Sequence, residues 1–213
     1  MKRHISVVCL MMAGVLFADT TPVMVSLVTP VQAPSRDYDV TGFRLSLIYG
    51  ECQEFTGLDI GIVDHTRKDF TGIAIGGANI AGDRLYGGQI GIFNWSRNGA
   101  TDWGRRSAGA QLGLLNHAET FIGLQEGFVN IANGTFTGLQ EGFLNRAYDV
   151  YGLQWGFYIP LLGVNLASGS LRGCQIGLVN YANRVEGGLQ IGFVNVIRQN
   201  GWAPFLPIVN GHF

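Results

Sequence analysis

Hydrophobic and polar positions alternate with a period of two along most of this chain. In the segment 136–145 (FTGLQEGFLN), one set of alternate positions holds Phe, Gly, Gln, Gly and Leu, and the other holds Thr, Leu, Glu, Phe and Asn. Successive side chains of a strand point to opposite faces, so this pattern predicts a strand of about ten residues. The recurring glycines disfavour a helix, because each costs ~1 kcal/mol in a helix interior. The sequence therefore predicts an all-β fold.

The strand pattern belongs to a tandem repeat, Gly-x-Gln-x-Gly-x-x-Asn. Well-kept copies begin at Gly87, Gly109, Gly123, Gly138, Gly152, Gly173 and Gly188, and degenerate copies begin at Gly57 and Gly72. Successive copies start 14 or 15 residues apart, except for gaps of 22 residues after Gly87 and 21 after Gly152. Such a regular period indicates repeated supersecondary units. Three further strands are predicted at Val23–Gln32, Thr41–Gly50 and Pro204–Phe213, which brings the expected total to twelve.

Two architectures can use this repeat, and we expect a closed antiparallel β-barrel of about twelve strands. Gly-x-Gln-x-Gly reads the same in both directions, so reversed neighbours still bring their glutamines to one level. Asn133-Gly134 lies between two copies, and Asn-Gly is a strong hairpin signal. Ten residues at ~3.4 Å, tilted by ~40°, span about 25 Å, which is the apolar height of an outer-membrane barrel. The terminal Phe213 and the aromatic residues near strand ends also favour this prediction.

The alternative is a β-solenoid in which each copy forms one coil and the Gln and Asn side chains stack into ladders. Glu126 and Glu141 favour it, because both fall on the face that would meet lipid in a barrel. Phe55, Phe70, Phe121 and Phe136 favour it too, because they share the other face with the glycines and the glutamines. A solenoid with one packed interior accommodates both observations.

The N-terminal segment reads as an export signal. Lys2, Arg3 and His4 precede an uncharged, mostly apolar run from Ile5 to Phe17, which is too short to span a bilayer and typical of a signal peptide. We expect residues 1–18 to be the signal peptide and residues 19–213 to form one repeat-built β domain. Glycine is abundant, with 32 residues, and a formal net charge of −1 gives no electrostatic footprint for nucleic acid.

The repeat copies, together with LSLIYG (Leu45–Gly50) and PFLPIVN (Pro204–Asn210), resemble bacterial exported surface-repeat proteins of the leptospiral type. The resemblance covers roughly Val40 to Phe213. It implies a location at the cell surface or in the outer membrane of a diderm bacterium, and it carries over no functional residue. Asp59 and Ala74 at glutamine positions and Ile159 at an asparagine position depart from the pattern.

Most of the distinctive residues have a structural interpretation. The repeat glutamines are expected to form a ring or ladder of amides that satisfy one another's hydrogen bonds. They are Gln89, Gln111, Gln125, Gln140, Gln154, Gln175 and Gln190. Candidate ligand contacts are Glu126 and Glu141, whose neighbouring carboxylates could share a cation. Further candidates are Trp95, Arg97, Trp103, Arg105 and Arg106 in the insert Trp95–Ala108, which could recognise an anion or a sugar.

No constellation typical of an enzyme is present in the sequence. His65, His117 and His212 lack the spacing of a metal site, and Ser96 or Ser107 with His117 is a weak candidate for a hydrolase. Cys52 and Cys174 leave a disulfide open, and no cofactor or metal is expected. We therefore expect a structural or interaction protein of the cell envelope, with a membrane as its partner and no nucleic acid. The alternative is a soluble or surface-attached solenoid that acts as a binding or adhesive module.

Overall fold

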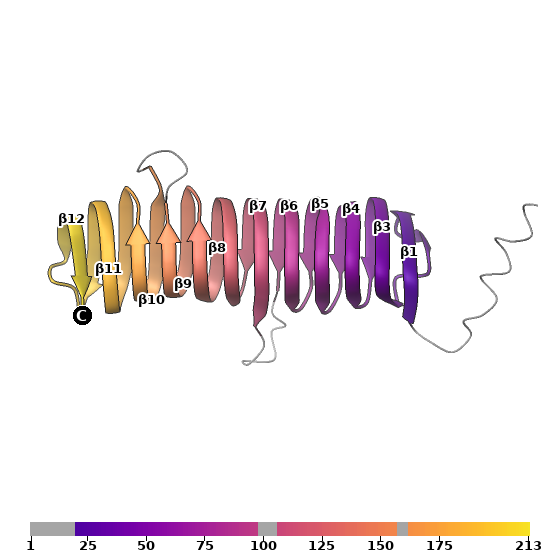
Figure 1. Cartoon of the computed structure of the whole chain (residues 1–213), viewed down its shortest axis with the longest axis horizontal. Helices are drawn as coiled ribbons and strands as arrows, with labels where there is room; N and C mark the ends of the chain where they lie inside the picture. The colour runs from indigo at the N-terminus through magenta and orange to yellow at the C-terminus, as the bar shows by residue number, and fades with distance from the viewer. Residues whose placement is uncertain (1–19, 98–105, 157–161) are drawn as a thin grey trace, which may run out of the picture.

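The chain winds into a β-solenoid of about 11 coils (Figure 1). The computed structural model describes residues 20–97, 106–156 and 162–213. The strands are β1 (Thr20–Val28), β2 (Val31–Ala33), β3 (Asp39–Cys52), β4 (Phe55–Thr66), β5 (Phe70–Ala81), β6 (Leu85–Ser96), β7 (Ser107–Ala118), β8 (Phe121–Glu141), β9 (Leu144–Trp155), β10 (Val164–Ile176), β11 (Val179–Gln199) and β12 (Phe205–His212).

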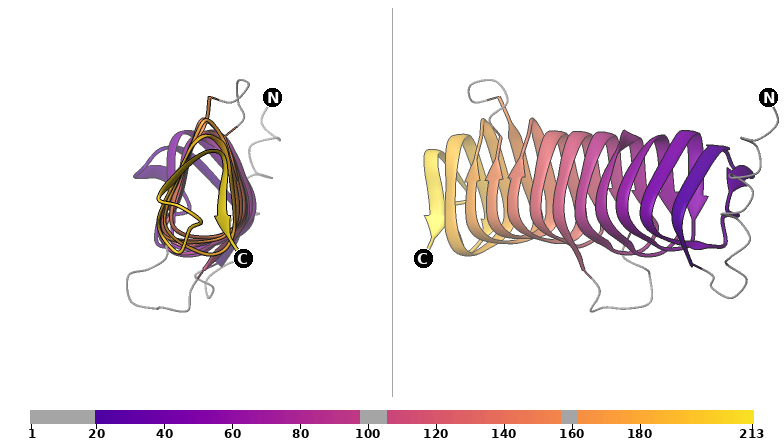
Figure 2. Two further views of the ribbon diagram at one scale, coloured as in Figure 1. Left: turned by 90° about the vertical axis from the view of Figure 1, so that its left-hand side faces the viewer. Right: turned by 45° about the vertical axis from the view of Figure 1, so that its right-hand side comes forward.

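The predicted closed antiparallel barrel is wrong, and the solenoid alternative is confirmed. From β3 to β11 every strand pairs in parallel with the next one along the chain. The register places identical repeat positions side by side, with Gly57 opposite Gly72 and Gly72 opposite Gly87. Each coil therefore stacks directly on its predecessor, and the view down the axis shows the coils superimposed (Figure 2). The repeat amides of successive coils can then bond their counterparts above and below.

The hairpin predicted at Asn133-Gly134 is a corner of the solenoid instead. β8 runs through this corner without a break over 21 residues. The Gly134 N–H donates to the carbonyl oxygen of Glu119 in the preceding coil at 2.7 Å. A chain that bends at a corner and continues in the same rotational sense produces parallel neighbours, whereas a hairpin would have reversed it.

Four rows of side chains fill the interior. Two are apolar: a row of large residues that includes Phe55, Phe70, Phe121 and Phe136, and a row of small residues that includes Ala118 and Ala132. The aromatic rings stack between neighbouring coils, with centroids 5.1 Å apart for Phe55 and Phe70. The other two rows are the repeat glutamines and asparagines, which are buried. The core is thus half apolar and half amide.

The glutamines form a continuous hydrogen-bonded ladder from Gln89 to Gln190. From Gln111 onward, each Nε2 donates to the Oε1 of the glutamine in the preceding coil, at 2.6–2.9 Å. Several also donate across the coil to a backbone oxygen six residues later, as Gln175 does to Tyr181 at 3.1 Å. These bonds satisfy polar groups that would each cost about 1–3 kcal/mol if buried without a partner.

The asparagines form a second ladder that runs in the opposite sense. Each Nδ2, from Asn79 to Asn180, donates to the Oδ1 of the asparagine in the following coil at 2.8–2.9 Å. The sequence pattern places the asparagines at the ends of copies, but the structure places them inside the coil. Asn165 occupies the ladder position in the copy where the spacing pointed to Ile159. The intervening segment 157–161 lies outside the described residues.

The first glycine of each copy is required by backbone geometry. At Gly87 the φ angle is +131°, and a Cβ there would lie 2.0 Å from the carbonyl oxygen of Gly72. The neighbouring Gly88 has open space around its Cβ position. The repeat therefore keeps glycine where the coils approach each other closely and the backbone is left-handed.

Both ends of the solenoid are covered by an antiparallel strand. β12 pairs antiparallel with β11, and β2 pairs antiparallel with β1. Pro207 within β12 has no N–H to offer a further strand. Uncovered parallel edges would bond to other chains, so these short reversed strands end the stack.

Candidate binding surface

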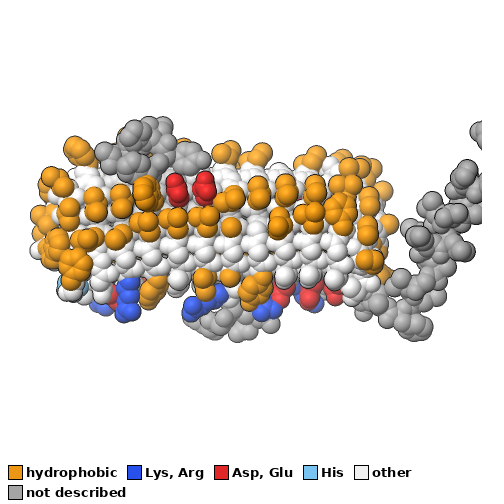
Figure 3. Space-filling model, viewed as in Figure 1, with side chains coloured by type: hydrophobic (Ala, Val, Ile, Leu, Met, Phe, Trp, Pro, Cys, Tyr) orange, Lys and Arg blue, Asp and Glu red, His pale blue; other side chains and the backbone are white. Residues whose placement is uncertain are grey.

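The outward side of the Gly-x-Gln-x-Gly strand forms an apolar face that runs along the solenoid (Figure 3). We define the apolar face as the outward residues directly after the first glycine, after the glutamine and after the second glycine of each copy. In β4 these are Leu58, Ile60 and Ile62, which are 39%, 37% and 58% exposed. Because the coils are in register, each position forms a straight row along the molecule.

The rows are nearly free of polar side chains. The first contains Ile73, Leu124, Leu139, Leu153, Cys174 and Leu189; the second contains Ile75, Ile90, Leu112, Trp155, Ile176 and Ile191; and the third contains Ile92, Leu114, Phe128, Phe143, Leu178 and Phe193. The nine copies and the coil of Gly42, which lies opposite Gly57, make ten coils. Ten coils spaced by ~4.8 Å give a length of about 43 Å, and five residues at ~3.3 Å give a width of about 17 Å. The area is on the order of 700 Å², larger than the apolar patches of most soluble monomers.

Charged side chains gather along a different edge, which we call the polar corner (Figure 3). This corner is the turn that precedes the large apolar residue of each coil, and residues 67–69 form it after β4. Its charges are mostly paired: Arg84 contacts Asp69, Lys68 Nζ lies 3.5 Å from Glu54, and Arg172 donates to Glu186 at 2.9 Å. The cross-section of the molecule is therefore amphipathic.

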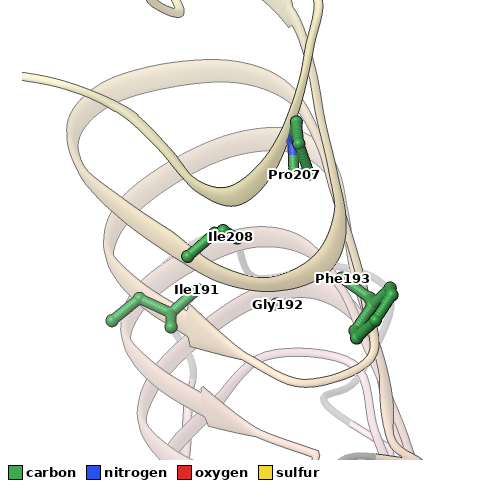
Figure 4. A pocket seen from close by; sticks show the side chains of 5 residues that line it. All are labelled: Ile191, Gly192, Phe193, Pro207 and Ile208. Carbon is green, nitrogen blue, oxygen red and sulfur yellow. The ribbon is translucent and has the colours of Figure 1, made fainter.

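The apolar face ends in a hollow beside β12 (Figure 4). Ile191, Phe193, Pro207 and Ile208 line a volume of about 410 Å³ together with Gly192. The register between β11 and β12 shifts after Gly192, and Ile208 adopts a φ of 72°, which opens the space between the two strands. Phe193 and Ile208 are 72% and 74% exposed. The hollow can receive an apolar group.

Glu126 and Glu141 lie side by side in the middle row of the apolar face. Glu126 directly follows Gln125 and Glu141 directly follows Gln140, and these two glutamines are hydrogen-bonded to each other in the ladder. The two glutamates therefore occupy the same repeat position in consecutive coils. Glu126 is exposed and Glu141 is half-buried. Neither carboxylate has a hydrogen bond or ion pair within the described residues. The two carboxylates therefore lie in adjacent coils, and no third ligating side chain among those residues completes a metal site with them. Their role as ligand contacts stays a prediction.

The structure brings together only part of the predicted Trp95–Ala108 site. Trp95 and Arg97 line a hollow of about 340 Å³ together with His65, Arg67 and Ile80. The Trp95 ring packs on that of His117, with centroids 4.1 Å apart. Arg106 is exposed before β7, and Trp103 and Arg105 lie outside the described residues.

The N-terminal coils replace the amide ladder with an ion pair that the repeat pattern does not reveal. Arg44, Asp59 and Ala74 occupy the glutamine positions of β3, β4 and β5. The buried Arg44 guanidinium donates to both carboxylate oxygens of Asp59. Burial alone would lower the pKa of Arg44, but the hydrogen bond and charge of Asp59 raise it overall. In the sequence, the only indication of this ion pair was Asp59 at a glutamine position. Its partner Arg44 lies in the coil before the first recognised copy, so the repeat pattern did not include it.

The remaining reactive groups are placed apart from one another. Cys52 is buried at the N-terminal end, whereas Cys174 lies on the apolar face near the other end, and both are free thiols. Burial raises the pKa of the Cys52 thiol to about 11. Burial lowers the pKa of His117. Helices long and apolar enough to cross a bilayer do not occur in the described part of the chain.

Comparison with known proteins gives no relative whose function could be proposed for this chain. Neither a protein family, nor a curated protein, nor a solved structure matches this chain.

Proposed function

We propose that the chain is a surface-attached β-solenoid of the bacterial cell envelope, a binding module that attaches to lipid through its apolar face. The observation that carries this proposal is the apolar face itself, with the charges collected on the polar corner. Burying on the order of 700 Å² of apolar surface at ~25 cal/mol per Å² yields about 17 kcal/mol, which is at or above the roughly 4–15 kcal/mol that association costs in lost translational and rotational freedom. The signal-peptide pattern of residues 1–18 supports export to the envelope.

A lipid surface fits this face better than a second copy of the chain does. Glu126 and Glu141 lie near the middle of the row, so a two-fold face-to-face dimer centred on the face would bring four carboxylates close together. At the headgroup level of a membrane the same two carboxylates retain water. The terminal hollow beside Phe193 and Ile208 offers room for part of one acyl chain.

Vesicle flotation tests the proposal. We expect the chain to float with phosphatidylcholine–phosphatidylethanolamine vesicles. Addition of phosphatidylglycerol or 0.5 M NaCl should change the bound fraction little, because the net charge is −1 and apolar burial drives the binding.

A matched pair of variants assigns the binding to the face. Ile60→Glu/Ile75→Glu places a second pair of carboxylates in the middle row, in β4 and β5, and should weaken vesicle binding about tenfold. Thr56→Glu/Thr71→Glu adds the same charge to exposed positions of the same two strands and should float normally. The natural pair Glu126 and Glu141 shows that consecutive coils accommodate adjacent carboxylates. Wild-type protein that stays at the bottom of the gradient, or equal flotation of both variants, would overturn the proposal.

A further inference from the structure

The polar corner contains a hollow that is distinct from the apolar face. We call it the corner trough. It has a volume of about 400 Å³ and is lined from three strands: Tyr148 and Tyr151 on β9, Ser170 on β10, and Asn183, Arg184 and Gln199 on β11. β11 passes through the corner twice, so the trough crosses four successive coils. Three spacings of ~4.8 Å give a length of about 14 Å.

Glycine opens the floor of the trough. Gly169 stands beside Tyr148, and a Cβ at Gly169 would lie 2.9 Å from the Cε1 atom of that ring and 2.5 Å from Asp149 Oδ1. In the next coil, Gly187 has nothing within 4 Å of its Cβ position. A side chain at Gly169 would fill the lining beside Tyr148 and Asp149, and Gly187, next to the lining residue Glu186, leaves open space at the edge, so a ligand can lie along the corner.

Exposed aromatic surface lines one end of the trough. Tyr148 is 56% exposed and Tyr151 is 37% exposed. The Arg172 guanidinium lies 5.6 Å from the Tyr151 ring centroid and also donates to Glu186 at 2.9 Å. These two contacts hold the guanidinium and the Tyr151 ring in place. Tyr rings provide a flat apolar surface with a polar tip, suited to ligands that are apolar on one side and polar at the edge.

Hydrogen-bonding groups without protein partners surround these rings. Asp149 Oδ1 accepts from the backbone N–H and the hydroxyl of Ser170, both at 2.7 Å, and leaves its second oxygen without a bond to any described residue. The Asn183 amide has no hydrogen bond within the described residues, so two donors and one acceptor are available. The trough therefore offers both donors and acceptors together with an aromatic platform.

The charges of the trough balance. Arg172 is paired with Glu186, and Arg184 Nη1 lies 4.0 Å from the same carboxylate. Asp149 adds one negative charge, so the two carboxylates offset the two guanidinium groups. A trough without net charge does not select a strongly anionic or cationic ligand.

We infer that the corner trough binds a short, neutral oligosaccharide, with a sugar ring stacked on Tyr151 and hydroxyl groups bonded to Asp149 and Asn183. A sugar ring presents C–H groups on its faces and hydroxyl groups at its edge, which matches an aromatic platform ringed by donors and acceptors. The length of about 14 Å fits linked rings rather than a single one.

Calorimetric titration of the chain in lipid-free buffer tests this inference. The probes are maltohexaose, cellohexaose and chitohexaose, with a heparin-derived hexasaccharide as the polyanionic comparison. We expect at least one neutral hexasaccharide to bind and the polyanion to bind more weakly. Failure of all three neutral probes, or preference for the polyanion, would overturn the inference without affecting the lipid proposal.

The chain offers a matched control for the aromatic platform. Tyr86 stands at the same repeat position as Tyr151, directly before the first glycine, is 40% exposed and has the Arg84 guanidinium 5.5 Å from its ring centroid. Tyr151→Ala should weaken binding about tenfold, as should Asn183→Ala, whereas Tyr86→Ala should leave it unchanged. Tyr151→Phe keeps the ring and should bind like wild type. Equal effects of Tyr151→Ala and Tyr86→Ala would exclude the trough as the binding site.

Discussion

At the scale of single residues, the interior of this protein depends on amides that bond only to one another and to the backbone. Gln140 Nε2 donates to Gln125 at 2.8 Å, and Gln140 Oε1 accepts from Gln154 at 2.7 Å. Both neighbours are fully buried. Loss of one amide therefore leaves a donor in one neighbouring coil and an acceptor in the other without a hydrogen bond, where no water can replace the missing partner.

Replacement of Gln140 by leucine should destabilise the solenoid by about 2–4 kcal/mol. The Nε2 of Gln154 and the Oε1 of Gln125 would each remain buried without a hydrogen bond. Urea denaturation followed by circular dichroism measures this effect. Glu141→Gln, one residue away on the outward side, should change stability by less than about 0.5 kcal/mol. Equal stability of the two variants would show that the ladder adds nothing to the packing.

The asparagine ladder begins at a carboxyl group. Asp64 of β4 lies opposite Asn79 of β5, and the Oδ1 of Asn79 has no hydrogen-bond partner within the described residues. Burial, reinforced by the negative charge of Asp59, raises the pKa of Asp64 to about 7, although Arg44 opposes the shift. The folded state thus holds a proton that the unfolded state releases near pH 4.

Stability should therefore fall as the pH rises from about 4 to about 7, because in this window the folded state binds more protons than the unfolded state. Asp64→Asn should remove this dependence and add about 1–3 kcal/mol at pH 8, since the new amide can donate to Asn79. Urea midpoints measured between pH 4 and pH 9 test this, with the exposed Glu54→Gln as the control. An unchanged pH profile in Asp64→Asn would assign the dependence to another group.

At the scale of elements, the reversed strand β12 closes a stack that would otherwise continue. It pairs with β11 from Gly188 to Val196, and the Trp202 N–H donates to the carbonyl oxygen of Gly211 at 2.9 Å. Without β12, the N–H and C=O groups of β11 would form an open sheet edge. Such edges bond to other chains.

Removal of residues 205–213 should therefore cause the protein to self-associate through the exposed end. Size-exclusion chromatography with light scattering measures the change in mass relative to the full chain. Removal of Phe213 alone, which is 82% exposed and follows β12, should leave the mass unchanged. A truncated protein with the same mass as the full chain would mean that β12 does not protect this edge.

At the scale of the whole molecule, one amphipathic cross-section is repeated along the axis. A type of side chain that recurs at one repeat position therefore forms a continuous surface along the molecule. A single Ile60 would be an ordinary exposed residue, but its counterparts in successive coils create the apolar face. The same stacking gathers the charges at the polar corner. Glu126 and Glu141 are the charged residues that interrupt the apolar rows among the described positions.

Removal of these two charges should strengthen attachment to lipid. Glu126→Leu/Glu141→Leu makes the middle row continuous, and we expect an about tenfold lower Kd for phosphatidylcholine–phosphatidylethanolamine vesicles, because the centre of the face no longer has to stay at the headgroup level to keep two carboxylates hydrated. Glu54→Leu/Glu119→Leu removes the same charge outside the apolar face and should leave the Kd unchanged. Weaker vesicle binding by the first variant would indicate that the carboxylates themselves contact the partner.

The sequence by itself determined the repeat unit, a strand of about ten residues, and which of its side chains lie on the same face. Period-two alternation placed Phe136 and Gln140 on one face and Leu139 on the other, and the tandem copies predicted stacked amides. The residues of the corner trough could not be predicted from the sequence. Tyr148, Asn183 and Gln199 are far apart in the chain and meet only because successive coils pass the same corner.

Only the tertiary structure decided the direction of neighbouring strands. An alternating pattern is the same whether the next strand is parallel or reversed, and Gly-x-Gln-x-Gly is symmetric in both directions. The choice depends on the corners, where residues such as Asn133 and Gly134 continue the coil instead of reversing it. Once the coils are parallel, identical residues align, so the buried amides bond in ladders and the outward isoleucines and leucines form one face.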